Sequence, residues 1–144
     1  MSLDDYLHQR GVFEIEGYSR QVPAQMHDLI HFTSKPNARV MEIGFNAGHS
    51  AEIFLQNNPT LSLVSFDLGI HDYVAIGKEY IDSAYPGRHT LILGDSCQTV
   101  PEFHRQHPGT TFDIIFIDGG HEYHIAKADI DNCFTPTKIC NRTL

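Results

Sequence analysis

The sequence predicts an α/β protein in which a parallel sheet is covered by helices on both faces. Apolar runs of strand length alternate along the chain with segments of helical periodicity, as in strand–helix–strand units. The strand candidates are almost continuously apolar, which is expected where helices bury both faces of a sheet. Several of these runs also stop abruptly at a glycine or an acidic residue.

The first half of the chain contains two expected helices and two expected strands after a polar start. Apolar residues recur at helical spacing over 21–34, and a proline follows. Residues 38–43 are partly β-branched and end at a glycine, which indicates a strand. A helix is expected over 47–57, where Asn-Asn-Pro breaks the pattern. The second strand covers 61–66 and ends at an aspartate.

The second half repeats the alternation. A helix is expected over 73–84 and stops at Pro-Gly, and the third strand covers 89–93. A short helix over 98–106 precedes another Pro-Gly. The fourth strand is expected over 111–117, and a further helix over 121–133.

The alternation predicts a Rossmann-like sheet with right-handed crossovers and the strand order 3-2-1-4. The switch point then lies between the first and fourth strands, and ligands bind there, outside the carboxyl ends of the strands. Residues 1–134 are expected to form this domain. Residues 135–144 fit no continuing pattern and read as an irregular tail.

Composition excludes several classes of function. The formal charge of −8 argues against nucleic acid as partner, because such affinity depends on Lys and Arg. No run approaches the roughly 20 apolar residues that cross a bilayer, and the acidic N-terminus lacks a signal-peptide pattern. The three cysteines show no CxxC spacing, so neither a disulfide framework nor a zinc knot is suggested. A reducing, cytoplasmic location is the default expectation.

A glycine turn joins the first strand to the next helix. In the run Glu42-x-Gly44-x-x-x-Gly48, Gly44 permits a sharp turn and Gly48 permits close backbone approach. The helix that follows presents free N–H groups to an anionic ligand, and Ser50 can add a hydrogen bond. Neither the GxGxxG fingerprint nor a P-loop is present. A plain turn that needs glycines for packing would give the same pattern.

Acidic residues also end the next two strands. Asp67 follows the glycine turn by about 20 residues, where a carboxylate can accept hydrogen bonds from a ribose diol and repel a 2′-phosphate. Asp95 and Ser96 close the third strand, where Asp95 can accept from an adenine amino group. For each aspartate alone, a solvated strand end is the favoured interpretation. Their combination with the glycine turn indicates a nucleoside site.

The fourth strand ends in Asp118-Gly119-Gly120-His121. His121 has the chemistry of a general base, and Asp118 can hold a divalent cation that lowers the pKa of a hydroxyl. Alternatively, Asp118 caps a helix and His121 lies in its exposed first turn. A zinc site at His121 and His124 lacks a third ligand with suitable spacing.

These segments together resemble class I S-adenosylmethionine-dependent methyltransferases. The acid two residues before the glycine turn matches motif I of that family, although Asn46 stands where a glycine is common. Asp118 to His121 resembles the D-G-x-H signature of small-molecule O-methyltransferases acting on macrolides and rhamnosyl groups, in which the Asp ligates magnesium and the His is the proposed base. The resemblance implies an S-adenosylmethionine pocket formed by Glu42, Gly44, Asn46, Gly48, Ser50, Asp67, Asp95 and Ser96.

The resemblance implies methyl transfer to a small-molecule hydroxyl, with magnesium as a candidate metal. The family has more strands than the four expected here, so we expect a chain truncated at its C-terminus. The fourth strand would then be an edge that pairs with another chain, a second copy included. Two alternatives stay open: a catalytically inactive nucleoside-binding or protein-interaction module, and an NAD-dependent oxidoreductase.

Overall fold

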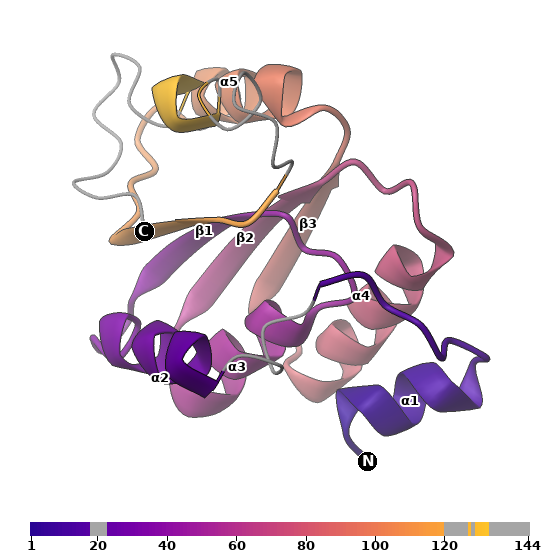
Figure 1. The fold of residues 1–144 in the computed structure, drawn as a ribbon. Helices are drawn as coiled ribbons and strands as arrows, with labels where there is room; N and C mark the ends of the chain where they lie inside the picture. The colour runs from indigo at the N-terminus through magenta and orange to yellow at the C-terminus, as the bar shows by residue number, and fades with distance from the viewer. Residues whose placement is uncertain (18–22, 120–126, 128, 133–144) are drawn as a thin grey trace.

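A computed structural model describes residues 1–17, 23–119, 127 and 129–132. At its centre lies a four-stranded sheet, and every neighbouring pair of strands is parallel. The order β3-β2-β1-β4 confirms the predicted topology and places the switch point between β1 and β4 (Figure 1). The strands are β1 (Arg39–Ile43), β2 (Ser62–Asp67), β3 (His89–Leu93) and β4 (Ile114–Ile117).

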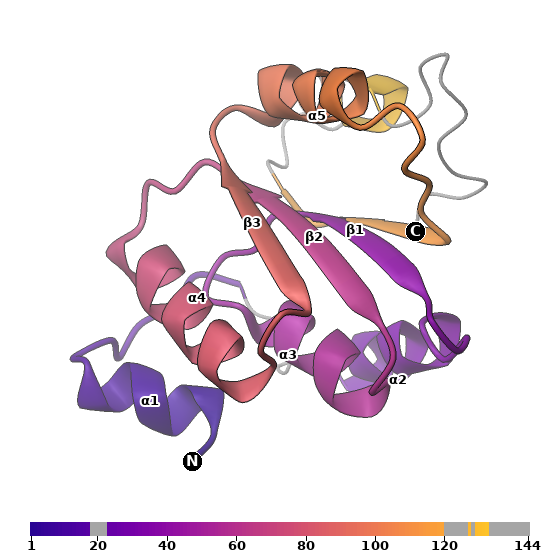
Figure 2. The same ribbon diagram turned by 180° about the vertical axis from the view of Figure 1, so that it is seen from behind.

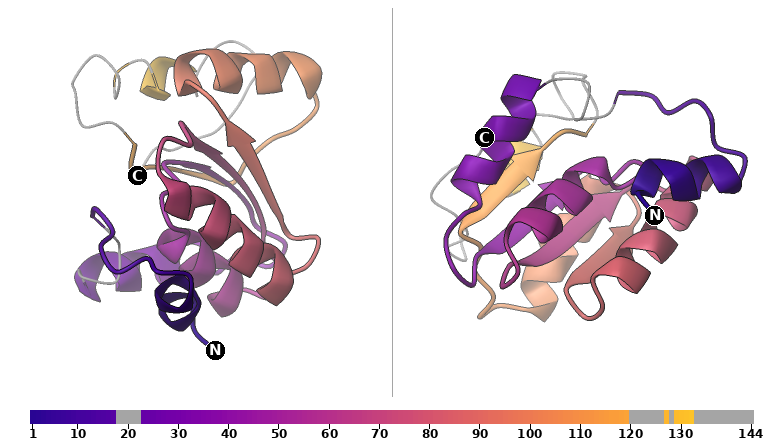
Figure 3. Two further views of the ribbon diagram at one scale, coloured as in Figure 1. Left: turned by 90° about the vertical axis from the view of Figure 1, so that its right-hand side faces the viewer. Right: turned by 90° about the horizontal axis from the view of Figure 1, so that it is seen from below.

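Helices cover both faces of this sheet. Helices α2, α3 and α4 lie on one face with α1 outside them, and α5 lies on the other (Figures 1 and 2). Seen from the side, the sheet separates the two helical layers (Figure 3). In the described part of the chain, no helix is both long and apolar enough to cross a bilayer. The helices are α1 (Leu3–Gln9), α2 (Pro23–Phe32), α3 (His49–Asn57), α4 (Asp72–Ala84) and α5 (Ser96–Gln106).

Helix α1 is the element that the sequence analysis missed, because residues before 21 read as a polar start. The helix has a capping box in which the side chain of Ser2 accepts from the Asp5 N–H and the Asp5 carboxylate accepts from the Ser2 N–H. Leu3 and Leu7, four residues apart, are fully buried in a cluster with Ala47. The Ser-x-x-Asp spacing and the leucine pair were therefore the available signals.

The remaining expected elements occur with shifted ends. Strand β4 begins at Ile114 rather than 111, and α5 begins at Ser96 because Asp95 caps it. Of the helix expected over 121–133, residues 127 and 129–132 are described and are helical. The expected tail over 135–144 lies outside the described residues.

Two apolar clusters lie against the sheet, one on each face, and β1 contributes to both because its side chains alternate. Val40 belongs to the cluster beneath α2, α3 and α4, whereas Met41 and Ile43 belong to the cluster beneath α5. Glu42 points to the same face as Val40 by this alternation, and it is fully buried. A carboxyl group in the central strand needs partners, and these lie beside the candidate site.

Candidate functional site

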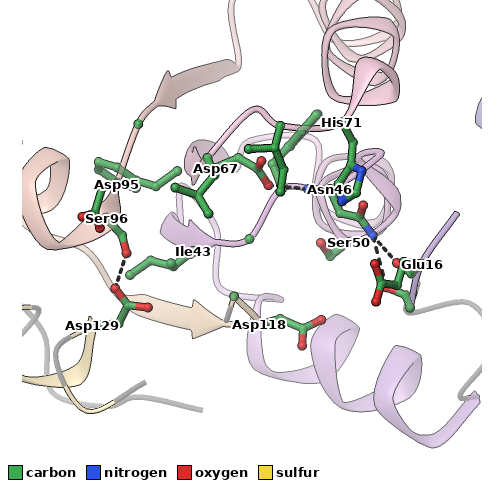
Figure 4. Close-up of a pocket in the computed structure, with 18 of the residues that line it drawn as sticks. Glu16, Ile43, Asn46, Ser50, Asp67, His71, Asp95, Ser96, Asp118 and Asp129 are labelled. Carbon is green, nitrogen blue, oxygen red and sulfur yellow. Dashed lines mark hydrogen bonds between the residues drawn. The ribbon is translucent and has the colours of Figure 1, made fainter. Parts of the chain in front are cut away.

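A cavity of about 670 Å³ opens at the carboxyl ends of the strands (Figure 4). Pockets for small molecules and cofactors usually measure roughly 300–1,000 Å³. Its wall combines apolar side chains with carboxylates and hydroxyls from the ends of all four strands. The apolar part includes Ile43, Phe66, Leu68 and Ile70.

The turn after β1 forms the floor of the cavity. Gly44 has φ +100° and Asn46 has φ +55°, both in the left-handed region. A Cβ atom on Gly44 would lie 2.4 Å from the backbone oxygen of Asp118, so only glycine lets β1 and the end of β4 approach this closely. Gly77 of α4 packs against the same turn, and a Cβ atom added there would lie 2.1 Å from the backbone oxygen of Ala47. The turn is held from two sides.

Asp67 lies in the wall between the two ends of the cavity (Figure 4). Its Oδ2 accepts from the Asn46 N–H at 2.8 Å, and its Oδ1 accepts from the Gly69 N–H at 2.8 Å. These two bonds fix the orientation of the carboxylate. An ionised carboxylate offers about four acceptor positions, so Asp67 keeps capacity for a ligand hydroxyl on each oxygen.

The segment after α1 crosses to the same turn, a contact that the sequence analysis missed. The Asn46 side-chain amide donates to the backbone oxygens of Glu16 at 2.7 Å and Gly17 at 3.2 Å. Both residues line the cavity, as does His49, whose Nε2 lies 2.8 Å from Asp4 Oδ1. The sequence carries no signal for the Asn46 contact, since its acceptors are main-chain carbonyls that any residue supplies.

Asp95 and Ser96 line the opposite end of the cavity, as the sequence predicted for a shared site. The Asp95 carboxylate caps α5 by accepting from the Cys97 N–H at 2.9 Å. The Ser96 hydroxyl donates to Asp129, a cavity residue that the sequence analysis missed. Asp129 is 1% exposed, and burial raises the pKa of its carboxyl.

Glu42 and Gly48 were expected in the pocket, but they lie behind its wall. Gly48 is the N-cap of α3 with φ +96°. The Glu42 carboxyl accepts hydrogen bonds from Ser50, which does line the cavity, and from Ser65 at 2.6 Å. Burial raises the pKa of Glu42 to about 7, against the opposing effect of the two hydroxyls. Among the described residues, Ser50 connects Glu42 to the cavity by a hydrogen bond.

The Glu42 contacts continue to the far edge of the sheet. Ser65 Oγ lies 2.9 Å from His89 Nε2, and the His89 carbonyl accepts from Lys78 at 3.0 Å. The His89 ring stacks on Phe45 of the glycine turn, and burial lowers its pKa to about 3. His89 is thus held neutral, which keeps a second charge out of the core.

The end of β4 contributes Asp118 and Gly119 to the cavity, while His121 and His124 lie outside the described residues. The expected role of His121 stays a prediction. Within the described ranges, no group of three or more His, Cys, Asp or Glu side chains is placed to hold a metal ion. Asp118 offers one carboxylate, so these residues do not by themselves fit a magnesium site.

A family model described as a methyltransferase domain matches residues 41–137. The matched region begins within β1, continues past β4 and includes the carboxyl ends of all four described strands. A search of curated proteins gave no significant match.

Solved structures share the fold at low sequence identity. CalS11, a TDP-rhamnose 3'-O-methyltransferase of calicheamicin biosynthesis, is 23% identical with a TM-score of 0.63, over 77% of this chain and 55% of its own. A putative caffeoyl-CoA O-methyltransferase from Staphylococcus aureus is 16% identical with a TM-score of 0.69, over 97% and 62%. An O-methyltransferase from Bacillus cereus in complex with S-adenosylhomocysteine (SAH) is 17% identical with a TM-score of 0.69, over 95% and 63%. The chain thus spans 55–63% of their lengths.

Proposed function

This chain belongs to the methyltransferase domain family, and from that premise we propose that it binds S-adenosylmethionine and transfers a methyl group to a small-molecule hydroxyl. The observation that carries the proposal is the position of Asp67. Its carboxylate is fixed inside the cavity by two backbone N–H groups, of which Asn46 N–H belongs to the glycine turn, and Asp67 lies between this turn and Ser96 in Figure 4. A ribose bound there would have an amino-acid chain on one side and a base on the other.

The residues around Asp67 fit such a ligand. Gly44 and Asn46 bring backbone without bulky side chains to one end, where the N-terminus of α3 favours a carboxylate. Ser50 places a hydroxyl at that same end. At the other end, Asp95 and Ser96 supply acceptors suited to an adenine amino group.

The acceptor side of the proposed site is formed by the end of β4. S-adenosylmethionine supplies an electrophilic methyl group on a sulfonium centre. In the proposal, His121 takes the proton from the acceptor hydroxyl, since a neutral imidazole is a suitable base near pH 7. Asp118 helps to orient that hydroxyl, and alignment at about 3 Å contributes much of the rate enhancement. No step is assigned to a metal, because the described ligands do not complete a site.

Asp67→Ala is expected to weaken SAH binding about a hundredfold, because two hydrogen bonds from the ribose to a charged acceptor are lost. Isothermal titration calorimetry measures this directly. Asp28→Ala on α2, an exposed carboxylate remote from the cavity, is the matched control and should leave the affinity unchanged. If Asp67→Ala and the unaltered chain bound SAH with equal affinity, Asp67 would not contact the ligand as proposed.

The same calorimeter separates the alternatives. Binding of SAH and not of NAD supports the proposal, whereas binding of NAD alone favours an oxidoreductase. If neither binds, the interaction module is the better account. Pairing of a second copy along β4 also stays a prediction, and the mass of the chain in solution tests it.

His121→Ala is expected to lower the rate of methyl transfer about a hundredfold while SAH affinity is kept, because only the proton acceptor is removed. Transfer of labelled methyl from S-adenosylmethionine to a set of small hydroxyl compounds provides the measurement. His27→Ala, an exposed histidine of α2, serves as the control. An unchanged rate in His121→Ala would exclude His121 as the base.

A further inference from the structure

One end of the cavity is organised by a pair of residues that are 33 positions apart in the sequence. Ser96 is the first residue of α5 and lines the cavity. Asp129 lies in the helical residues beyond β4 and accepts the Ser96 hydroxyl proton on its Oδ1 (Figure 4). The other oxygen of Asp129, Oδ2, has no hydrogen-bond partner among the described residues. The buried carboxyl group of Asp129 thus has the Ser96 hydroxyl as its hydrogen-bond donor.

The direction of this hydrogen bond fixes what Ser96 presents to a ligand. An ionised carboxylate can only accept, and a hydroxyl has a single proton. Because that proton is directed to Asp129, the Ser96 oxygen offers only lone pairs to the cavity. Asp95 beside it is also an acceptor and already takes the Cys97 N–H. At these two positions the cavity thus offers side-chain acceptors and no strong side-chain donor, which favours N–H groups on a ligand.

We propose that Asp129 is a positioning residue that holds Ser96 as a hydrogen-bond acceptor and thereby selects a purine with a 6-amino group over one with a 6-oxo group. The inference rests on the proposed function and adds to it the chemical basis of base selection. A 6-amino group donates to Ser96, whereas a 6-oxo group would face two acceptors with no proton between them. A 6-oxo oxygen that is buried in a binding site without a hydrogen-bond donor lowers the affinity of its ligand.

The test compares SAH with S-inosylhomocysteine, its 6-oxo counterpart, by calorimetry at about pH 8, where a carboxyl is ionised. The unaltered chain is expected to prefer SAH by about ten- to a hundredfold. In Asp129→Asn the amide can donate to Ser96, so the serine proton is free to turn toward the ligand. The preference should then fall to about threefold or less, with the fold kept by circular dichroism.

Asp131→Asn is the matched control, because Asp131 lies on the same helical segment in a solvent-exposed ion pair with Lys127. It should keep the full preference. Ser96→Ala provides a second route should Asp129→Asn fail to fold, since loss of the hydroxyl should also lower the preference. An undiminished preference in the variant that folds would overturn the inference and leave the proposed function intact. Failure of the unaltered chain to bind SAH would instead defeat the proposed function and the inference with it.

Discussion

Gly44→Ala is expected to lower the free energy of unfolding by about 3–5 kcal/mol and to reduce SAH binding below detection. Two costs combine at this position. The backbone has φ +100°, which an L-residue with a side chain rarely adopts. The added methyl would also lie 2.4 Å from a backbone oxygen of Asp118, which cannot move without displacing the end of β4. Since both segments line the cavity, relief of the contact deforms the site.

Gly87→Ala separates the two costs. Gly87 also has a positive φ, +74°, but a Cβ atom there meets nothing within 4 Å. It lies in the turn between α4 and β3, away from the cavity. We expect Gly87→Ala to lower the free energy of unfolding by about 1 kcal/mol and to leave SAH binding unchanged. Urea unfolding and calorimetry measure both variants, and equal losses at the two glycines would show that the contact with Asp118 is unimportant.

Glu42→Gln is expected to make the chain more stable at alkaline pH, by about 3 kcal/mol at and above pH 8. The pKa of Glu42 rises from 4.5 to about 7 because the carboxyl is buried. The unfolded chain therefore loses this proton first as pH rises. Between pH 4.5 and about 7 the folded state binds more protons, so stability falls with rising pH through this window. A glutamine cannot ionise and escapes this loss.

The measured quantity is the difference in free energy of unfolding between Glu42→Gln and the unaltered chain. Contributions from the titrating groups that both chains share cancel in this difference. Urea unfolding near pH 4.5 should give nearly equal stabilities, and the gap should open as pH approaches about 8. His89 titrates in both chains and drops out of the comparison. Glu14→Gln removes an exposed carboxyl and should show no such gap. If the free energies of unfolding of the two chains differed by the same amount at all pH values, ionisation of Glu42 would not be the cause of the expected pH dependence.

Much of the fold was predictable because its signals are local. Within the described residues, the alternation of apolar runs and helical periodicity predicted the four strands, their order and the helices other than α1. The candidate site followed in part from the same rule. Asp67, Asp95, Ser96 and Asp118 end successive parallel strands, and the carboxyl ends of such strands meet at one edge of a sheet.

The contacts that organise the cavity were not predictable in the same way. Asp129 meets Ser96 across 33 positions, and the Glu16 carbonyl meets Asn46 across 30. Periodicity says nothing about such pairs, because they depend on how loops from different strands are brought together. The position of Glu42 behind Ser50 is also a tertiary result, since strand alternation assigns it a face but not the hydroxyls that meet it there.

The amino-acid sequence alone thus determined the class of fold, the edge of the sheet where the cavity opens and the aspartates at the ends of β2, β3 and β4 that line it. These properties depend on residue type and spacing within single segments. The tertiary structure decided which carboxyl groups face the cavity and which support it from behind, and in which direction their hydroxyl partners donate. Such properties arise only when segments far apart in the chain share one buried environment, where each polar group must find a partner.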